Sequence, residues 1–398
     1  MKYASLAWST YSAQNGDMNQ VEIPAAFYRG GTSKGVFFHN KDLPDDKDRK
    51  DDAFLQVIGS PDPYGRQLNG MGGGISSLSK IVIISPPSNS HADVDYTFAQ
   101  VSVDKPIVDY NTNCGNLSSA VGPFAIDEEL VKLDKYEGVQ TVRLFNTNTR
   151  VLVHAHVPVV GGKAAVKGKC KIQGVHGTGS CIRLDYLKPG GATTGRVLPI
   201  GEEISMLSLT SGDIFEVSII DAATAMVFVA IKYLNLNVSE NPESVDGNID
   251  LMKCLESIRR FAGVRIGLAD SPESVPPTNP KVALLAPPTE FNALDGTHIS
   301  TSGQDITARV ISLNKMHRAI PLTSAMCLAA ACGIHGSLPH RLIKKSISGE
   351  IRIGTPSGVL KVGAEVKKVR DKWLVDSTSS YRTARRLMQG SVLIPHFT

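Results

Sequence analysis

A glycine- and serine-rich stretch at residues 68–80 (LNGMGGGISSLSK) holds residue types that suit an anion-binding site. Glycines permit positive φ angles and close approach of the backbone, so successive N–H groups can turn toward one ligand. Serines add short hydroxyl donors. The alternative is a flexible surface linker. The residues expected to bind an anion here are Gly73, Gly74, Ser76, Ser77 and Ser79.

Lys80 ends this stretch and directly precedes the apolar run 81–84 (IVII), which predicts a strand. A strand would hold the lysine in place, which argues against a mere linker. An ordinary lysine, with a pKa of about 10.4, is protonated at neutral pH and is no base. Burial or a nearby cation would lower that pKa. We therefore expect Lys80 to be a catalytic base, the alternative being a solvated lysine at a strand start.

Cys114 stands where a polar motif (NCGN) gives way to the uncharged apolar run 117–126. A helix without a polar face is a buried helix, so we expect this cysteine at or just before a helix N-terminus. Such a terminus lowers the pKa of a thiol and binds carboxylates. The alternative is a buried, inert cysteine, which fits the other five cysteines. The neighbours expected to line the same site are Asn113, Gly115 and Asn116.

A second uncharged helical run covers residues 322–333 (LTSAMCLAAACG). We expect His317, Thr323 and Ser324, at and before its start, to form an opposite wall that holds a second carboxylate. The alternative is an ordinary helix cap beside a surface histidine.

A glycine-rich turn between the aromatic and branched runs 23–28 and 36–38 predicts a hairpin. The turn carries cationic and hydroxyl side chains and could also contact an anion. The candidates are Arg29, Thr32 and Ser33.

The sequence offers little for a metal or a nucleotide. His154 and His156 alternate along a predicted strand without an obvious third ligand. No G-x-G-x-x-G motif follows a strand and opens a helix. We expect neither a metal nor a cofactor.

Each half of the chain combines predicted strands with one of the two buried helices. This arrangement predicts an α+β fold of two similar domains, residues 1–190 and 191–398, with the C-terminal tail returning to the first. Further expected elements are short helices at 51–59 and 382–388 and a strand at 196–200.

Composition excludes several functional classes. The 398 residues are 42% hydrophobic and carry a net charge of +4, without the basic cluster of a nucleic-acid-binding protein. No apolar run approaches the roughly 18–20 residues of a membrane span, and residues 1–20 lack the apolar core of a signal peptide. We expect a soluble, cytoplasmic protein that binds neither nucleic acid nor membrane.

Three motifs closely resemble the 2-methylaconitate cis–trans isomerase (PrpF) family, and the resemblance extends from about residue 21 to 395. They are residues 27–38 (FYRGGTSKGVFF), 70–80 (GMGGGISSLSK) and 113–116 (NCGN). The segment 382–388 (RTARRLM) also looks like the ending of that family.

The resemblance implies the diaminopimelate epimerase-like fold, with two pseudo-symmetric domains and an active site in the cleft between them. It implies that Lys80 abstracts the proton and that Cys114 lines the site. Racemases of this fold carry a second cysteine at the position of Pro321, so a two-cysteine racemase is disfavoured. This chain departs from the family pattern at Asp221-Ala222 and at Gly354, which leaves the substrate open.

The function implied is a cofactor-independent isomerase of an unsaturated polycarboxylate, with 2-methylaconitate of the methylcitrate cycle in propionate catabolism as the first choice. A methylitaconate double-bond isomerase and a 4-oxalomesaconate tautomerase use the same proton chemistry and stay open. A non-catalytic accessory protein for a dehydratase is the alternative from another class. A homodimer and a functional link to an aconitase-like dehydratase are further expectations.

Overall fold

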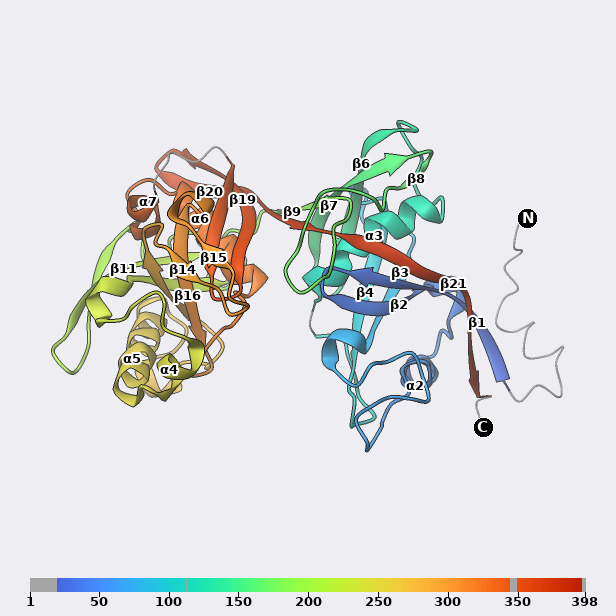
Figure 1. Cartoon of the computed structure of the whole chain (residues 1–398), viewed down its shortest axis with the longest axis horizontal. Helices are drawn as coiled ribbons and strands as arrows, with labels where there is room; N and C mark the ends of the chain where they lie inside the picture. The colour runs from blue at the N-terminus through green and yellow to red at the C-terminus, as the bar shows by residue number, and fades with distance from the viewer. Residues whose placement is uncertain (1–19, 112, 344–348, 396–398) are drawn as a thin grey trace. The chain divides into compact units, whose positions relative to one another are not determined.

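A computed structural model describes residues 20–111, 113–343 and 349–395 of the chain. It divides into two compact units (Figure 1): unit 1 is Met1–Leu184 with Tyr381–Thr398, and unit 2 is Asp185–Ser380. The division lies shortly before the boundary expected at residues 190 and 191, and the C-terminal segment belongs to unit 1. Residues 1–19, where no signal peptide was expected, lie outside the described residues.

Unit 1 is built on a mixed sheet in which neighbouring strands follow the order β21-β1-β2-β3-β4-β6-β7-β8. β3 pairs in parallel with β2 and antiparallel with β4. The strands are β1 (Gln20–Gly30), β2 (Ser33–His39), β3 (Lys80–Ser85), β4 (Val94–Val101), β5 (Val108–Asp109), β6 (Gly138–Asn146), β7 (Val151–Val160), β8 (Lys163–Ala164), β9 (Ile182–Leu187) and β21 (Ala384–Pro395). The helices are η1 (Asn40–Asp42), α2 (Lys47–Ile58), η2 (Ser76–Leu78) and α3 (Gly115–Asp127).

Two helices cover opposite faces of this sheet, because successive side chains of a strand point to opposite sides. On β2, Phe38 stacks on Phe54 of α2, whereas Phe37 packs against Phe124 of α3. Every side chain from Leu117 to Ile126 of α3 is buried, as expected for a helix without a polar face. Figure 1 shows α3 among the strands of unit 1.

Unit 2 repeats this plan with the strand order β10-β11-β12-β13-β16-β18-β19-β20. The strands are β10 (Ser205–Ser208), β11 (Ile214–Asp221), β12 (Ala225–Ala230), β13 (Lys281–Ala286), β14 (Phe291–Asn292), β15 (His298–Ile299), β16 (Ile306–Ser312), β17 (Lys315–Met316), β18 (Glu350–Thr355), β19 (Gly358–Val369) and β20 (Lys372–Arg382). The helices are η3 (Ile231–Leu234), α4 (Pro242–Gly247), α5 (Ile249–Arg265), η4 (Pro272–Ser274), η5 (Thr301–Gly303), α6 (Leu322–Gly333) and α7 (Leu338–Leu342).

The central strands of unit 2 are apolar on both faces, which is why they read as continuous hydrophobic runs. Phe228 of β12 and Leu285 of β13 pack with α6, whereas Val229 and Leu284 pack with α5. α6 is alanine-rich, a composition that favours helix, and is buried from Ser324 to Cys332. The expected α+β class, with a buried helix in each of two similar units, is therefore confirmed.

Two expected elements are wrong. Residues 382–388 form the end of β20 and the start of β21, not a helix, because β21 pairs antiparallel with β1 along its whole length. Residues 196–200 form turns rather than a strand. The expected helix at 51–59 is confirmed as α2, which ends at Ile58 with Gly59 in the left-handed conformation of a helix C-cap.

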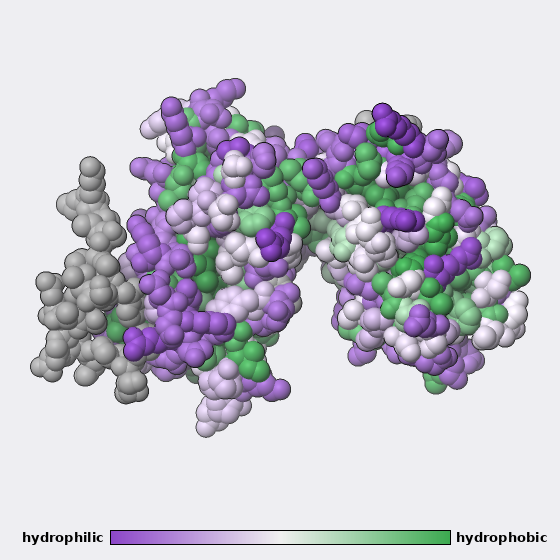
Figure 2. Space-filling model, turned by 180° about the vertical axis from the view of Figure 1, so that it is seen from behind, coloured by the Kyte–Doolittle hydropathy of each residue, from purple (hydrophilic) through white to green (hydrophobic). Residues whose placement is uncertain are grey.

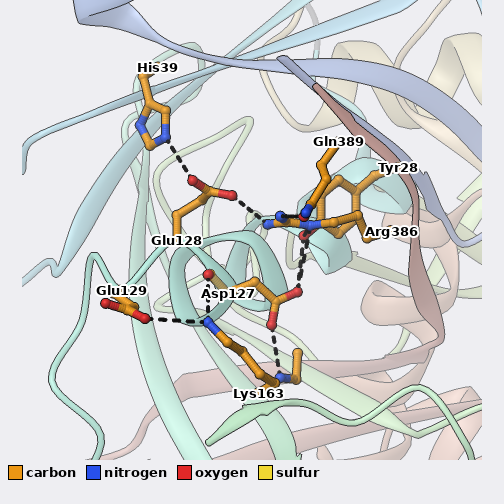
Figure 3. A network of polar contacts seen from close by, with 9 residues as sticks. Tyr28, His39, Asp127, Glu128, Glu129, Lys163, Arg386 and Gln389 are labelled. Carbon is orange, nitrogen blue, oxygen red and sulfur yellow. Dashed lines mark hydrogen bonds and ion pairs between the residues drawn. The ribbon is translucent and has the colours of Figure 1, made fainter. Parts of the chain in front are cut away.

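A network of polar contacts joins β21 to the C-terminal end of α3 (Figure 3). Arg386 donates to the Tyr28 hydroxyl at 2.7 Å, and a second guanidinium nitrogen lies 2.8 Å from the Glu128 carboxylate. The imidazole Nε2 of His39 lies 3.4 Å from the other oxygen of that carboxylate. The Tyr28 hydroxyl in turn donates to Asp127 at 3.2 Å. The network fixes α3 from the end opposite to Cys114.

We expect Glu128→Gln to destabilise the protein at neutral pH and to have less effect in acid. The hydrogen bond from His39 and the ion pair with Arg386 lower the pKa of Glu128 from 4.5 to about 2. A lowered folded-state pKa stabilises the protein above the unfolded-state pKa, and this contribution is lost as the pH falls from about 4.5 toward 2. Urea unfolding at several pH values would measure the difference between the two proteins. Glu129→Gln, at the adjacent and exposed carboxylate, is the control and should show no such pH dependence. A difference that stays constant from pH 7 to pH 3 would contradict this assignment.

Among the described residues, no helix combines the length and apolar character needed to cross a membrane. On the face shown in Figure 2, hydrophilic and hydrophobic side chains are interspersed on both units. Leu68 and Ile75, both from the glycine- and serine-rich stretch, are among the exposed apolar side chains. That stretch therefore offers apolar contact beside its polar donors.

Candidate active site

Lys80 is the first residue of β3 and is almost completely buried, with 8% of its surface exposed. Its ammonium nitrogen donates to the side-chain oxygen of Gln100, its antiparallel partner on β4, at 2.6 Å. The same nitrogen lies 4.9 Å from the centre of the Phe98 ring. The strand pairing thus places the amine against one neutral polar group and one aromatic face.

Two opposed influences act on the pKa of Lys80. Burial lowers it from the ordinary value of 10.5, and the nearby Cys114 sulfur raises it by a smaller amount. The net effect is a lowered pKa, because removal of water disfavours the charged form of an amine. The neutral amine that a general base needs is therefore more accessible than for a solvated lysine.

Cys114 is the N-cap residue of α3 and is buried, which confirms its expected place at the helix start. Its thiol lies 3.8 Å from the hydroxyl of Ser33 on β2, within range of a weak S–H donation. Its backbone carbonyl accepts from both the N–H and the hydroxyl of Ser118, one turn into the helix. The cysteine is thus held by backbone contacts while its sulfur faces β2.

Glycines allow β1 and β2 to approach the start of α3 closely. A methyl group on Gly30 would lie 2.6 Å from the carbonyl oxygen of Asn116, and one on Gly35 would lie 2.8 Å from the carbonyl oxygen of Lys80. No residue with a side chain fits at these distances. The close approach brings the start of β3, the turn after β1 and the N-terminus of α3 together.

Gln67 organises the glycine- and serine-rich stretch. Its side-chain oxygen accepts from the Gly74 N–H at 2.9 Å and from the Ser79 hydroxyl at 2.7 Å, and its amide donates to Ser60. The Ser79 hydroxyl also lies 2.9 Å from the Ile75 carbonyl and is fully buried. The Gly74 N–H and the Ser79 hydroxyl are therefore already bound to Gln67. Gly73 and Ser76, by contrast, lie exposed and Ser77 half-exposed.

Polar side chains around the start of α3 bind one another. The Asn116 amide donates to Thr32 at 3.1 Å and its oxygen accepts from Arg382 at 3.2 Å. The Asn113 oxygen accepts from Asn146 at 3.1 Å. Arg29 donates to the carbonyl of Thr383, so its guanidinium holds the junction between β20 and β21.

Unit 1 therefore brings together most of the expected ligands within a small number of elements. They lie at the facing ends of β1 and β2 and on the turn between them, on the stretch before β3 and at the start of α3. They are Arg29, Thr32, Ser33, Gly73, Gly74, Ser76, Ser77, Ser79, Asn113, Gly115 and Asn116. Their roles toward a substrate stay a prediction.

His317, Thr323 and Ser324 lie in unit 2, near or within the first turn of α6, whose N-cap is Pro321. The Ser324 hydroxyl and the His317 Nε2 are buried without a hydrogen-bond partner among the described residues. Burial and the nearby Lys281 ammonium lower the pKa of His317, which favours its neutral form. The role of these three residues as carboxylate ligands is also still a prediction.

Asp221, one of the departures from the family pattern, has a structural role in unit 2. The residue is fully buried, and one carboxylate oxygen accepts from the N–H groups of Thr193 and Thr194 at 2.7 and 2.6 Å. The Thr194 hydroxyl donates to the same oxygen at 2.9 Å. The carboxylate therefore fixes the turn that follows Pro189-Gly190.

Sequence reasoning missed Gln100, Gln67 and Lys281. The two glutamines had no local signal, since each acts through contacts with residues distant in sequence. Lys281 did have one, because Pro280-Lys281-Val282 repeats the pattern of a lysine before an apolar strand seen at Lys80. Lys281 is the first residue of β13, which pairs in parallel with β12 and antiparallel with β16, as β3 does with β2 and β4. Burial lowers the pKa of Lys281 too.

Among the described residues, no group of three or more histidine, cysteine, aspartate or glutamate side chains could hold a metal ion. His154 and His156 point to one side of β7, and His156 Nδ1 lies 2.9 Å from the Thr141 hydroxyl. The site consists of an amine, a thiol, amides, hydroxyls and backbone N–H groups.

In each unit a sheet packs around one buried helix, which starts after a cysteine in unit 1 and after a proline in unit 2, as in the diaminopimelate epimerase-like fold. The family model described as PrpF protein matches residues 20–395. This chain belongs to the PrpF family.

Several relatives of known or proposed activity are similar over nearly the whole chain. The 3-methylitaconate isomerase of Eubacterium barkeri is 40% identical over 381 residues, covering 94% of this chain and 98% of the relative. The 2-methyl-aconitate isomerase of Shewanella oneidensis is 35% identical, with 94% and 98% covered. The 4-oxalomesaconate tautomerase of Pseudomonas putida is 34% identical, with 95% and 97% covered.

One solved structure agrees closely with this fold. The crystal structure of methylitaconate-delta-isomerase superposes with a TM-score of 0.88 at 39% identity, covering 95% of this chain and 97% of that chain. The protein is accordingly an isomerase, and a non-catalytic carboxylate-binding role is disfavoured.

Proposed function

We propose that this isomerase moves a proton within an unsaturated di- or tricarboxylate, with 2-methylaconitate as the first candidate substrate. The observation that carries the proposal is the buried Lys80 amine, held by the neutral Gln100 amide beside the Cys114 thiol. An amine in these surroundings loses its proton more readily than a solvated lysine and can then accept one from carbon.

The reaction would begin with removal of a proton by neutral Lys80 from a CH₂ group that lies next to a carboxylate and to the double bond. The electron pair of the broken C–H bond spreads over the alkene and the carboxylate as a dienolate. The original double bond thereby becomes nearly single, and the carbon skeleton can rotate. Return of a proton to carbon completes a cis–trans change or a shift of the double bond, without net change in Lys80. General-base catalysis of this kind contributes about 10²–10⁴-fold.

The negative charge that develops on the dienolate needs fixed hydrogen-bond donors. We assign this role to the exposed donors of the stretch before β3 and of the turn between β1 and β2, and to the N-terminus of α3. They are the Gly73 N–H, the hydroxyls of Ser76, Ser77 and Thr32, and the Gly115 and Asn116 N–H groups. The positive end of the α3 dipole adds to their effect on a carboxylate.

Methylitaconate is the second candidate substrate. The 40% identical relative and the structure with a TM-score of 0.88 both carry the name of a methylitaconate isomerase. Proton removal would be the same in both reactions, and only the carbon that receives the proton would differ. The homodimer and the link to an aconitase-like dehydratase stay predictions.

The test is NMR of candidate acids incubated with the purified protein in D₂O. The acids are 2-methylaconitate, cis-aconitate, methylitaconate and oxalomesaconate, each also incubated without protein. We expect one acid to gain deuterium at its CH₂ group and to convert to an isomer. Absence of exchange and of conversion in all four would contradict the proposed function.

We further propose that the Cys114 thiol returns a proton to the dienolate, and that the Lys80 ammonium then passes its proton to the thiolate, so that both groups end as they began. Cys114→Ala should therefore separate the two half-reactions. Exchange of the CH₂ proton should persist, whereas net isomerisation should fall by about 10²-fold, as for loss of a general acid. The measurement is the ratio of deuterium incorporation to product formed in D₂O. Cys254→Ala, at a half-buried cysteine of α5, is the control and should leave the ratio unchanged. Unchanged isomerisation in Cys114→Ala would mean that this thiol donates no proton and only lines the pocket.

A further inference from the structure

The Gln100 amide has a single orientation that its own contacts determine. Its nitrogen lies 3.1 Å from the Ser76 carbonyl, 2.9 Å from the Ser79 carbonyl and 3.2 Å from the Val101 carbonyl. Only the NH₂ group of a carboxamide can donate to carbonyls, so the oxygen must face Lys80. Reversing the amide would direct donors at an ammonium and leave these carbonyls without their partner.

Gln100 also connects the amine to the stretch that precedes β3. Ser76 begins η2 and Ser79 directly precedes Lys80, and both use their backbone carbonyls to bind the same amide. The Ser79 carbonyl additionally accepts from the Val101 N–H at 3.0 Å. A change at Gln100 is therefore transmitted both to the amine and to the proposed carboxylate ligands.

The acceptor that Gln100 presents is neutral, and this matters for a base. A carboxylate at the same distance would stabilise the ammonium and hold Lys80 protonated, whereas an apolar side chain would leave the amine without an acceptor. In the part of the chain that the structure describes, the Lys80 amine faces Phe98 and Gln100, which carry no ionisable group, and it lies near the Cys114 thiol. A neutral acceptor thus fixes the nitrogen without cancelling the effect of burial.

We propose that Gln100 is the positioning residue for proton transfer, which holds the Lys80 amine with a neutral acceptor and ties it to the backbone of Ser76 and Ser79. The proposal rests on the proposed function of Lys80 as the base. It adds a residue that acts through the Lys80 amine and through the backbone of Ser76 and Ser79.

The test compares Gln100→Glu and Gln100→Met with the parent protein in the pH dependence of kcat/KM. In Gln100→Glu the new carboxylate should raise the pKa of Lys80, so the acidic limb should move to higher pH. A shift by one pH unit would leave about tenfold less activity on that limb. In Gln100→Met the limb should move to lower pH, and kcat should fall more than KM changes. Opposite shifts are a signature that a merely structural role would not produce.

Gln140→Glu and Gln140→Met are the matched controls, because Gln140 is also a buried glutamine on a strand of unit 1 and binds a backbone carbonyl. Neither should move the acidic limb. Competitive labelling with acetic anhydride, followed by mass spectrometry of the Lys80 peptide, reports the protonation of Lys80 without any assay of turnover. It should show the same two opposite shifts.

An acidic limb and a labelling profile that stay at their parental positions in both Gln100 variants would overturn the inference. If Gln100→Glu does not fold, thermal unfolding will show it, and Gln100→Met then decides alone. The proposed function fails separately, when Lys80→Met retains exchange of the CH₂ proton. Loss of exchange in Lys80→Met together with unshifted Gln100 profiles would refute only the role of Gln100.

Discussion

Lys80→Met is expected to abolish deuterium exchange at the substrate CH₂ group and to lower kcat/KM by at least about 10²–10⁴-fold. Methionine has a similar length and is apolar, so it can occupy the buried space beside Phe98 while removing the amine. No other amine among the described residues donates to Gln100. The measurement is NMR of the substrate in D₂O, with thermal unfolding to confirm that the variant is folded.

Lys163→Met is the matched control for this variant. Lys163 is also the first residue of a strand of unit 1, β8, but its side chain is exposed and pairs with Glu129 on the surface. We expect full activity in this control. Undiminished exchange in folded Lys80→Met would remove Lys80 from the role of base, whatever the effect on net conversion.

Gly30→Ala should have the second largest effect, because it acts on the start of α3 through the backbone. The added methyl group would lie 2.6 Å from the Asn116 carbonyl oxygen and 3.0 Å from the Leu117 Cα, and neither atom can move by a simple rotation. Overpacking of this kind costs about 1–3 kcal/mol of unfolding free energy. The helix N-terminus with Cys114 must shift, and a displacement of about 1 Å at a site can reduce activity by about 10²-fold.

The two effects of Gly30→Ala can be measured separately, by urea unfolding and by kcat/KM on protein that is fully folded. Gly247→Ala, at the end of α4, is the control, since a methyl group there meets no atom within 4 Å. It should change neither quantity. Parental stability and parental activity in Gly30→Ala would mean that β1 and α3 can separate freely at this point.

Local sequence carried the information for the buried helices and for the positions of Lys80 and Cys114. An uncharged apolar run of helical length can only be buried, whatever surrounds it, so α3 and α6 were predictable. The change from asparagine and glycine to apolar residues likewise placed Cys114 at the N-cap. The strand after Lys80 followed from its branched apolar residues.

The C-terminal segment shows where local pattern fails. Residues 382–388 contain good helix formers, yet they are strand, because the antiparallel pairing with β1 satisfies their backbone hydrogen bonds. Intrinsic helix propensity differs by less than about 1 kcal/mol per residue and is readily overridden by such pairing. The partner strand lies more than three hundred residues earlier in the chain, and no local pattern reveals it.

The sequence alone located the candidates for chemistry: a lysine at a strand start, a cysteine at a helix start, and a glycine- and serine-rich stretch before them. Only the tertiary structure decided how these groups behave. The pairing of β3 with β4 sets Gln100 against Lys80, and the close approach of β1 and β2 to α3 sets Ser33 beside Cys114. The pKa of a buried amine depends on solvent exclusion and on neighbours brought from distant parts of the chain, and the spacing of residues in a sequence specifies neither.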